Sequence, residues 1–281
     1  MRVDAHHHLW EYDAAKYPWM TAEFASIRRR FGPEDLKPHL DRCGVDRTVV
    51  VQTRSSLEET QVFLEVAERT PFIAGVVGWV DLTSDRAAET IAALKTAQGG
   101  RRLVGIRHQV HDEADPAWLL RPDVQRGVAA VGQAGLAFDL LVRPRELRSA
   151  YETASRQPTM RFIIDHLAKP PIRDGGSSLW DTWMPRMATL PNVYCKLSGL
   201  VTEADWRSWT IEQLRPYVER ALAWFGADRM MFGSDWPVCL VAAPYATVFD
   251  IAMQLTQALT PAQMDAVLGN TTILAYELPR T

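Results

Sequence analysis

Met230-Met231-Phe232-Gly233-Ser234-Asp235-Trp236-Pro237 joins a short apolar run to an aspartate near the end of the chain. The apolar residues predict a strand, and Asp235 follows where that strand should stop. Near the start, Asp4-Ala5-His6-His7-His8 predicts a second strand. That strand places His6 and His8 on one side, because successive side chains in a strand alternate faces. Two imidazoles and a distant carboxylate, all at the carboxyl ends of strands, are what a closed parallel barrel needs to build an active site.

Short β-branched runs alternate with helical patterns along the whole chain, which indicates parallel βαβ units. The chain has 281 residues, of which 47% are hydrophobic. That length suits one α/β barrel of roughly 250 residues. We therefore predict a single domain, residues 1–281, with the (β/α)8 TIM-barrel fold. The predicted strands are Arg2–Ala5, Arg47–Gln52, Ile73–Val80, Leu103–Ile106, Ala137–Val142, Arg161–Ile164, Val193–Leu197 and Arg229–Phe232.

Four helices are legible from capping residues and apolar spacing. They are predicted over Ser55–Arg69, Ser84–Thr96, Trp209–Phe225 and Pro261–Tyr276. Two segments read as loops, residues 10–30 and residues 174–178. The first is long for a compact domain, and such loops often form active-site walls.

The bulk composition excludes several classes of function. A formal net charge of −3 offers no basic footprint for nucleic acid or for an anionic membrane. No apolar run approaches the length of a membrane span, and no signal peptide is apparent. The three cysteines have no CxxC spacing and are expected to be reduced thiols of a cytoplasmic protein. The partner should be a small molecule, whereas the oligomeric state cannot be inferred.

Every predicted strand ends in titratable or strongly polar residues, and in such barrels the strands' carboxyl ends carry the active site. Random surface loops would not concentrate these groups so consistently, so the pattern indicates an enzyme. The residues at the strand ends are His6, His8, Gln52, Arg54, Trp79, Asp81, Arg107, His108, Arg143, Asp165, His166, Lys196, Ser198, Ser234 and Asp235.

His6, His8 and Asp235 could bind one divalent ion such as zinc, with His166 as a fourth ligand. Alternatively, the two histidines hydrogen-bond the substrate or Asp235 directly. Asp235 is the best candidate for a catalytic base, since an ordinary aspartate is ionised at neutral pH.

Arg107 carries a fixed fork of donors that suits a carbonyl oxygen or a carboxylate, and we expect it to contact the substrate. Asp165 lies one residue before His166 and is expected to face away from the barrel interior. Lys196 and Ser198 share one strand face and are predicted to contact the substrate together. The alternative for Lys196 is an internal salt bridge.

Several motifs resemble the amidohydrolase superfamily, and specifically its lactonase branch. They occur in the order expected for that branch, and two stretches are closer still to the L-fuconolactonases, namely residues 201–206 and 231–240. The matching motifs are Asp4-Ala5-His6-His7-His8-Leu9-Trp10, Tyr17-Pro18-Trp19, Gly105-Ile106-Arg107-His108-Gln109, Asp165-His166-Leu167-Ala168-Lys169-Pro170 and Cys195-Lys196-Leu197-Ser198-Gly199-Leu200.

The resemblance implies a barrel enzyme that hydrolyses a sugar-acid lactone, such as L-fuconolactone, to the open aldonate. Superfamily members with two metals also use a lysine or glutamate on strand four and a histidine on strand five. Here strand four ends in Arg107-His108 and strand five has no histidine, so a dinuclear centre is not expected. A single zinc ion on His6, His8, His166 and Asp235 stays open, and we predict that no cofactor is required.

The expected mechanism has Asp235 activating water while His6, His8 and Arg107 hold the oxyanion. A lactone is an activated ester, so fixed cationic donors could suffice. The remaining predicted substrate contacts are Gln52, His108, His166, Trp10, Trp19, Lys196 and Ser198.

Three other functions compete with this prediction. A lactonase for a pyrone dicarboxylate would use Arg54, Arg107 and Arg143 to pair the carboxylates. A metal-dependent decarboxylase of the same superfamily would release carbon dioxide and lose activity on chelation. A non-catalytic sugar-binding barrel would bind ligands without turnover, but it has no use for a base set against imidazoles.

Overall fold

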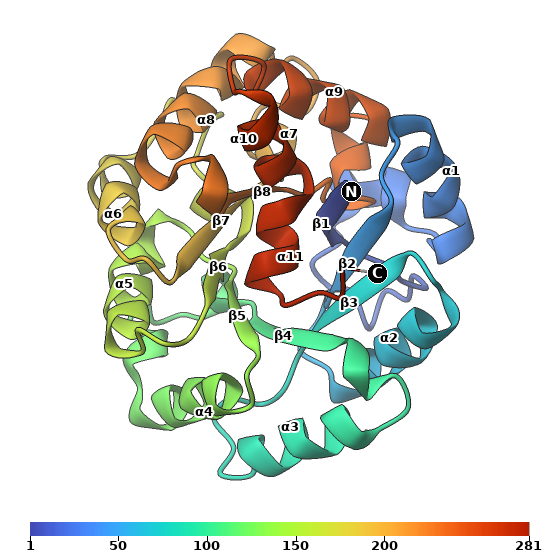
Figure 1. The fold of residues 1–281 in the computed structure, drawn as a ribbon, viewed down its shortest axis with the longest axis vertical. Coiled ribbons are helices and arrows are strands. Elements are labelled where there is room, and N and C mark those ends of the chain that lie inside the picture. The colour runs from blue at the N-terminus through green and yellow to red at the C-terminus, as the bar shows by residue number, and fades with distance from the viewer. Residues whose placement is uncertain (281) are drawn as a thin grey trace.

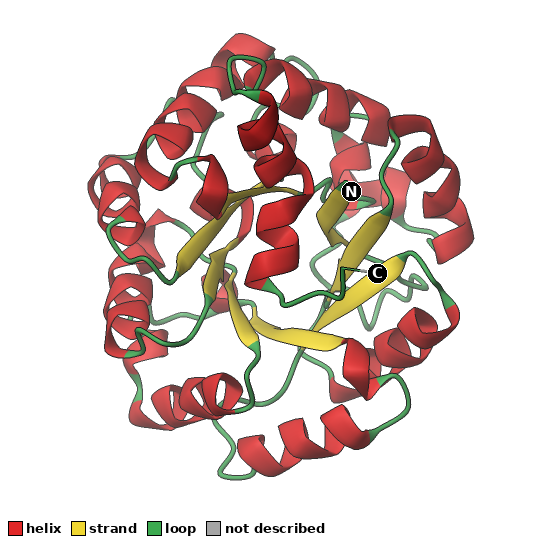
Figure 2. Cartoon of the chain, viewed as in Figure 1, coloured by secondary structure: helices red, strands yellow, loops and turns green. Residues whose placement is uncertain are grey.

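The computed structural model describes residues 1–280, and eight parallel strands form one sheet in chain order (Figures 1 and 2). Helices lie outside the ring of strands, as a (β/α)8 barrel requires. The predicted fold class is therefore confirmed, and each predicted strand overlaps an observed one. The strands are β1 Val3–His7, β2 Arg47–Val51, β3 Ile73–Gly78, β4 Leu103–His108, β5 Ala137–Leu140, β6 Phe162–Ile164, β7 Val193–Leu197 and β8 Met230–Phe232.

The barrel closes where β1 meets the chain that follows β8. His7 and Trp236 form a parallel bridge, with the His8 amide donating to the Trp236 carbonyl at 2.6 Å. The Asp235 amide donates to the His6 carbonyl at 2.8 Å. The pairing of β1 with β2 also shifts register between Asp4 and His7. Bulges of this kind re-aim side chains near active sites.

Eleven α-helices follow the strands within residues 1–280 (Figure 1). Helix α2 begins after Ser56, whose hydroxyl accepts a hydrogen bond from the Glu59 amide, as an N-cap should. None of these helices is long and apolar enough to cross a bilayer. The helices are α1 Pro33–Cys43, α2 Leu57–Arg69, α3 Ala87–Thr96, α4 Pro122–Gln133, α5 Leu147–Arg156, α6 Ser178–Ala188, α7 Leu200–Glu203, α8 Ile211–Phe225, α9 Tyr245–Leu255, α10 Pro261–Asp265 and α11 Thr271–Ala275.

The predicted C-terminal helix is interrupted. A π-helical turn, Ala266–Asn270, separates α10 from α11. Gly269 packs against the start of the chain, because an added Cβ there would lie 2.1 Å from the Met1 carbonyl oxygen. Helix α11 lies across one end of the barrel (Figure 1), and its Ile273 joins the apolar cluster of the interior. This end is a packed core, so polar groups are left for the opposite end.

The long loop after β1 folds back on itself rather than projecting into solvent. Trp10 pairs with Phe31 through two backbone hydrogen bonds, and its indole donates to the Ile27 carbonyl at 3.2 Å. Within the loop, residues Ala22–Ile27 form a 3-10 helix. The loop is thus anchored at both ends, which holds its middle over the mouth of the barrel.

Candidate active site

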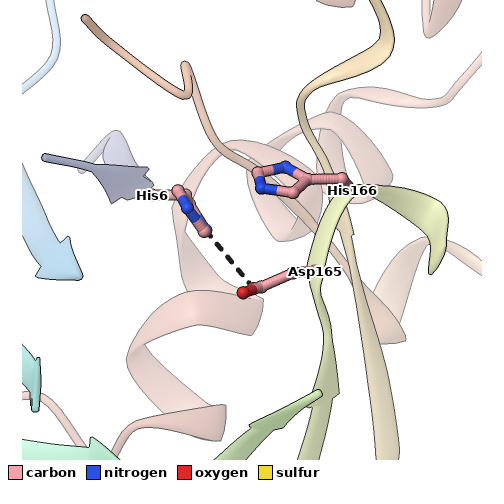
Figure 3. Close-up of side chains that lie close together, drawn as sticks. All are labelled: His6, Asp165 and His166. Atoms are coloured by element: carbon pink, nitrogen blue, oxygen red, sulfur yellow. Dashed lines mark ion pairs between the residues drawn. The ribbon is translucent and has the colours of Figure 1, made fainter. Parts of the chain in front are cut away.

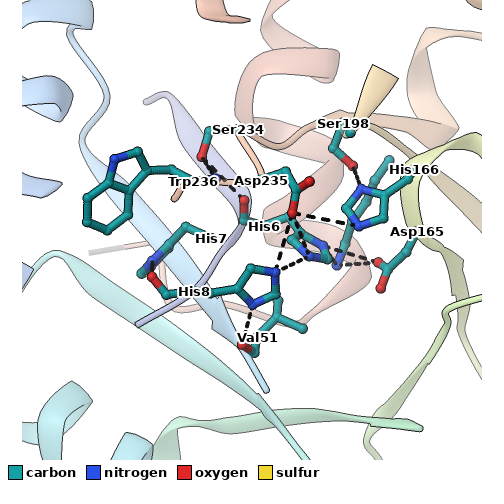
Figure 4. A network of polar contacts seen from close by, with 12 residues as sticks. His6, His7, His8, Val51, Asp165, His166, Ser198, Ser234, Asp235 and Trp236 are labelled. Atoms are coloured by element: carbon teal, nitrogen blue, oxygen red, sulfur yellow. Dashed lines mark hydrogen bonds and ion pairs between the residues drawn. The ribbon is translucent and has the colours of Figure 1, made fainter. Parts of the chain in front are cut away.

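The two predicted histidines and the predicted aspartate meet at one end of the barrel (Figure 4). The Nε2 atoms of His6 and His8 lie 3.2 Å apart. The Asp235 Oδ1 atom lies 3.4 Å from the His8 Nε2 and 3.8 Å from the His6 Nε2. All three residues are buried. The alternation of side chains along β1 therefore predicted their common direction correctly.

His166 completes this group from β6, with its Nε2 atom 3.8 Å from the Asp235 Oδ1. It stands in a left-handed turn in which four successive residues, His166 to Lys169, have positive φ between 49° and 58°. Such conformations are unfavourable for residues with a Cβ. The Trp180 indole donates to the Leu167 carbonyl at 2.7 Å and helps to hold the turn. Ser198 lies 2.8 Å from the His166 Nδ1 and fixes the ring.

Gly199 makes room for the His166 ring. Its φ is +65°, and an added Cβ would lie 2.6 Å from the His166 Nδ1. Any other residue would strain the backbone and push the imidazole away.

The hydrogen bonds of His8 settle which of its nitrogens carries the proton. Its Nδ1 lies 2.7 Å from the Val51 carbonyl oxygen, which can only accept. In the neutral ring the Nε2 therefore presents a lone pair to the Asp235 carboxylate, which is also an acceptor. These two acceptors, 3.4 Å apart, can share a donor, such as the nearby His6 Nε2 or a water molecule, or hold a cation between them.

A buried network of charges lies beneath the histidines. The Lys196 ammonium is 2.6 Å from the Asp139 Oδ2 and 2.9 Å from the Asp165 Oδ1. Arg107 donates to the Asp165 Oδ2 at 2.8 Å. The His6 ring pairs with Asp165 (Figure 3), with its Nδ1 3.3 Å from the Asp165 Oδ1 and 3.1 Å from the Lys196 ammonium. The network thus holds two cations, two carboxylates and the ring of His6.

This burial shifts several protonation equilibria. Burial, aided by the Lys196 charge, lowers the pKa of His6 well below its usual value, and burial lowers the pKa of His166 to about 4. Both rings are therefore neutral at pH 7. Burial opposes ionisation of Asp235, but the His166 and His8 imidazoles outweigh it and lower the pKa of that carboxyl. Asp235 is thus ionised at neutral pH and able to accept a proton.

The pKa values of Asp139 and Asp165 shift in opposite directions. Burial raises the pKa of Asp139 to about 6, although Lys196 opposes this. For Asp165 burial also disfavours the charge, yet Lys196, His6 and Arg107 together hold its pKa well below the usual value.

A pocket of about 390 Å³ opens above the histidines. Its floor includes His8, His166 and Asp235, and Arg107 lines one side. The residues of the walls and rim are Trp19, Phe24, Thr53, Gln109, His111, Asp112, Leu141, Arg143, Lys169, Thr202, Glu203, Trp206 and Val238. The pocket combines aromatic surfaces with many groups that hydrogen-bond, an arrangement typical of sites for small polar ligands.

The structure also corrects part of the sequence interpretation. Asp165 faces the barrel interior rather than away from it, because β6 ends at Ile164 and the chain turns there. Lys196 is fully buried beneath His6 and makes the internal salt bridge instead of lining the pocket. Ser198 lies 2.8 Å from the His166 Nδ1, and the expectation that it contacts the substrate together with Lys196 stays a prediction.

Three further predicted substrate contacts lie outside this pocket. His108 bonds Glu113 at 2.7 Å and the Trp79 indole at 3.1 Å, and it does not line the pocket. Gln52 is fully buried and donates to the Arg107 carbonyl. Trp10 is enclosed by the loop that follows β1. Of the predicted aromatic contacts, Trp19 lines the pocket.

Sequence reasoning assigned no role to some residues of this region. Asp139 is the counter-ion of Lys196, and its charge inside an otherwise apolar strand was a usable signal. Lys169 and Glu203 pair at the rim of the pocket, although neither lies at a strand end. Nothing in the local sequence pattern predicts that pairing.

The donor atoms suit a metal ion. In tetrahedral zinc sites with Zn–N distances of 2.0–2.1 Å, neighbouring ligand atoms lie about 3.3 Å apart. The facing atoms of His6, His8 and Asp235 are separated by 3.2, 3.4 and 3.8 Å. Among residues 1–280 these residues form one of two groups that could hold an ion. The second group is His6, Asp165 and His166.

Known proteins are similar to this chain in sequence and fold. The chain is 45% identical over 244 residues to an L-fucono-1,5-lactonase of Burkholderia ambifaria, covering 87% of this chain and 83% of that protein. It is 37% identical over 290 residues to an L-fucono-1,5-lactonase of Burkholderia multivorans, covering 99% and 97%. The crystal structure of a Burkholderia multivorans amidohydrolase with bound zinc superposes with a TM-score of 0.95 at 36% identity, covering 99% of this chain and all of that chain.

The sequence pattern of the amidohydrolase family matches residues 3–278, which is almost the whole chain. The expected family resemblance is thereby confirmed, and this protein belongs to the amidohydrolase family.

Proposed function

We propose that this protein is a lactonase that hydrolyses a sugar-acid lactone, L-fuconolactone or a related aldonolactone, to the open aldonate. One observation carries the proposal. The ionised Asp235 and the lone pair of His8 face each other at 3.4 Å on the floor of a polar pocket. The two relatives named as L-fucono-1,5-lactonases support the choice of substrate class.

The chemistry follows from the two facing acceptors. A water molecule donating to both the Asp235 Oδ1 and the His8 Nε2 is held with its oxygen toward the pocket. Asp235 takes one proton as the water oxygen bonds to the lactone carbonyl carbon. The carbon–ring oxygen bond then breaks, and the proton on Asp235 passes to the departing ring oxygen. The new carboxylic acid ionises and releases a proton, which makes turnover measurable with a pH indicator.

Arg107 is the best placed donor for the oxygen that becomes negative. Its side chain lines the pocket, and its Nε has no hydrogen-bond partner among the described residues. The expected sharing of the oxyanion with His6 and His8 is revised. His6 is fully buried, and the Nδ1 proton of His8 is bonded to the Val51 carbonyl. His166 is placed to orient the lactone ring.

A metal ion bound by His6, His8, His166 and Asp235 would polarise water or the carbonyl oxygen. The prediction that no metal is required rests on the intrinsic reactivity of the lactone and on the fixed charge of Arg107. Chelation tests it directly.

Acidic groups on the pocket wall favour a polyol over a dicarboxylate. Asp112 lines the pocket and would repel a pyrone dicarboxylate, whereas Glu203 is paired with Lys169. The Lys169–Glu203 pair offers donors and acceptors to sugar hydroxyls. Arg143 and Arg107 are the features that favour the dicarboxylate. A competition assay in which dicarboxylates inhibit better than sugar lactones would reverse this preference.

The proposed function is tested with a panel of sugar 1,4- and 1,5-lactones, followed by proton release. We expect turnover of L-fuconolactone by the wild-type protein. The Asp235→Asn variant should lower kcat by about 10²–10⁴, the usual loss for a general base. The His108→Gln variant is the matched control, because His108 does not line the pocket. Absence of turnover of every lactone in the panel by the wild-type protein would refute the proposal.

A further inference from the structure

Asp4, the first residue of the opening motif, has no part in the mechanism above, yet its carboxylate is fully buried. Its Oδ1 accepts hydrogen bonds from two backbone amides, that of His6 at 3.1 Å and that of Ser234 at 2.9 Å. Its Oδ2 accepts from the Tyr245 hydroxyl of α9 at 3.1 Å. One side chain thus joins the first strand, the turn after the last strand and the outer helix layer.

The two amides held by Asp4 belong to the segments that carry the reacting groups. His6 and His8 extend from β1, while Ser234 directly precedes Asp235. The Asp235 backbone has a φ of +57°, which is unfavourable for a residue with a Cβ. A conformation of this kind persists only when its surroundings determine it. The turn is also held by other bonds: the Asp235 amide donates to the His6 carbonyl, the Cys239 amide to the Asp235 carbonyl, and the Trp236 amide to the Ser234 hydroxyl.

The packing at this seam leaves little freedom. A Cβ added to Gly233 would lie 2.7 Å from the His6 Cβ, so the turn lies directly against β1. Loss of the carboxylate would leave two amides without acceptors in a dry environment, and the turn would shift to satisfy them. The shift would change the separation between the Asp235 carboxylate and the His8 imidazole.

We propose that Asp4 is a positioning residue that sets the distance between the base on the last strand and the imidazoles on the first. It acts across the closure of the barrel, between β1 and the turn that follows β8. This inference rests on the proposed function for its kinetic consequence, but its structural consequence is independent of any substrate.

The kinetic test compares Asp4→Ala, Asp4→Asn and Tyr245→Phe with the wild-type protein. Misplacement by about 1 Å can cost 10²-fold in rate, so we expect Asp4→Ala to lower kcat by about 100-fold with KM within about threefold. Asn retains one oxygen acceptor and should restore kcat to within about tenfold of wild type. Tyr245→Phe frees only the second oxygen and should lower kcat by about three- to tenfold.

Glu59→Ala is the matched control. Glu59 is another buried carboxylate that accepts from two backbone amides, those of Thr53 at 2.8 Å and Arg54 at 3.2 Å, but it lies after β2. A general effect of losing a buried carboxylate would lower kcat in this variant as much as in Asp4→Ala. We expect the fold-decrease in kcat of Glu59→Ala to be less than a third of that of Asp4→Ala.

A crystal structure of Asp4→Ala separates this inference from the proposed function. We expect the distance between the His8 Nε2 and the Asp235 Oδ1 to change by about 1 Å, whether or not any lactone is turned over. An unchanged distance, or a kcat within threefold of wild type, would overturn the inference. If Asp4→Ala does not fold, equal kcat in Asp4→Asn, Tyr245→Phe and wild type would overturn it.

Discussion

Replacing Lys196 with methionine removes one charge from the sealed network beneath the active site. Lys196 and Arg107 supply two positive charges, and Asp139 and Asp165 supply two negative ones, so the wild-type network is neutral. Both members of the Lys196–Asp139 pair have fully buried side chains. Breaking a buried pair by removing one partner costs about 3–5 kcal/mol, because the remaining charge has no compensation. We expect Lys196→Met to lower the free energy of unfolding by that amount at pH 7.

The magnitude can be checked by urea unfolding, followed through the fluorescence of the ten tryptophans. Adding Asp139→Asn to Lys196→Met removes the uncompensated charge and keeps an oxygen acceptor for the Tyr276 hydroxyl. The double variant should therefore recover at least about 1 kcal/mol, because neutral replacements of a buried pair are often tolerated. Lys169→Met is the control. Its partner Glu203 is 20% exposed, and we expect a loss below about 1 kcal/mol.

Two results would refute this reasoning. The first is a loss below about 1 kcal/mol for Lys196→Met, which would mean that water or another group compensates Asp139. The second is a double variant less stable than Lys196→Met alone. Either result would show that the charged network does not hold His6 in place.

Three other predictions follow from individual contacts. Gly199→Ala should lower kcat by about tenfold or more by displacing His166, since a 1 Å displacement can cost 10²-fold in rate. Gly135→Ala should leave kcat unchanged: its φ is also positive, but nothing lies within 4 Å of an added Cβ there. Burial lowers the pKa of His111 to about 3 in the folded protein, whereas the unfolded pKa is about 6.5. Below pH 6.5 the unfolded chain binds a proton that the folded protein excludes, so the stability present above pH 6.5 is lost as pH falls toward 3. Unfolding measured from pH 7 to pH 4 should show a stability loss that is steeper in wild type than in His111→Gln by up to about 1.4 kcal/mol per pH unit, and parallel curves would contradict the assignment. Protein stripped with a strong chelator should keep its lactonase rate within about tenfold, consistent with an electrophilic role for fixed charges, and abolition of turnover that zinc restores would show that the metal is required.

Much of the fold could be predicted because a (β/α)8 barrel requires a regular pattern in its sequence. Short apolar strands recur between helices, and the residues after each strand are polar. The direction of His6 and His8 followed from alternation along β1, and Asp235 from its place after β8. These inferences need only local geometry.

The errors have a different origin. Asp165 was assigned outward because alternation was extended past Ile164, where the chain leaves the strand for a left-handed turn. The depth of Lys196 along the barrel axis depends on strand stagger, which the local sequence pattern does not reveal. The sequence therefore could not choose between a substrate contact and the internal salt bridge that the structure shows. Trp10 was predicted to contact the substrate as an aromatic surface for a sugar, and His108 from its position at a strand end. Their hydrogen-bond partners, Ile27 and Glu113, are set by loop folding, which the local pattern does not predict.

The most direct test of the central claim is proton release from L-fuconolactone by wild-type protein and by Asp235→Asn, under identical conditions. The account predicts turnover by wild type and a kcat lower by about 10²–10⁴ in the variant, with folding intact. Near-normal turnover by Asp235→Asn would contradict the assignment of Asp235 as the base that activates water.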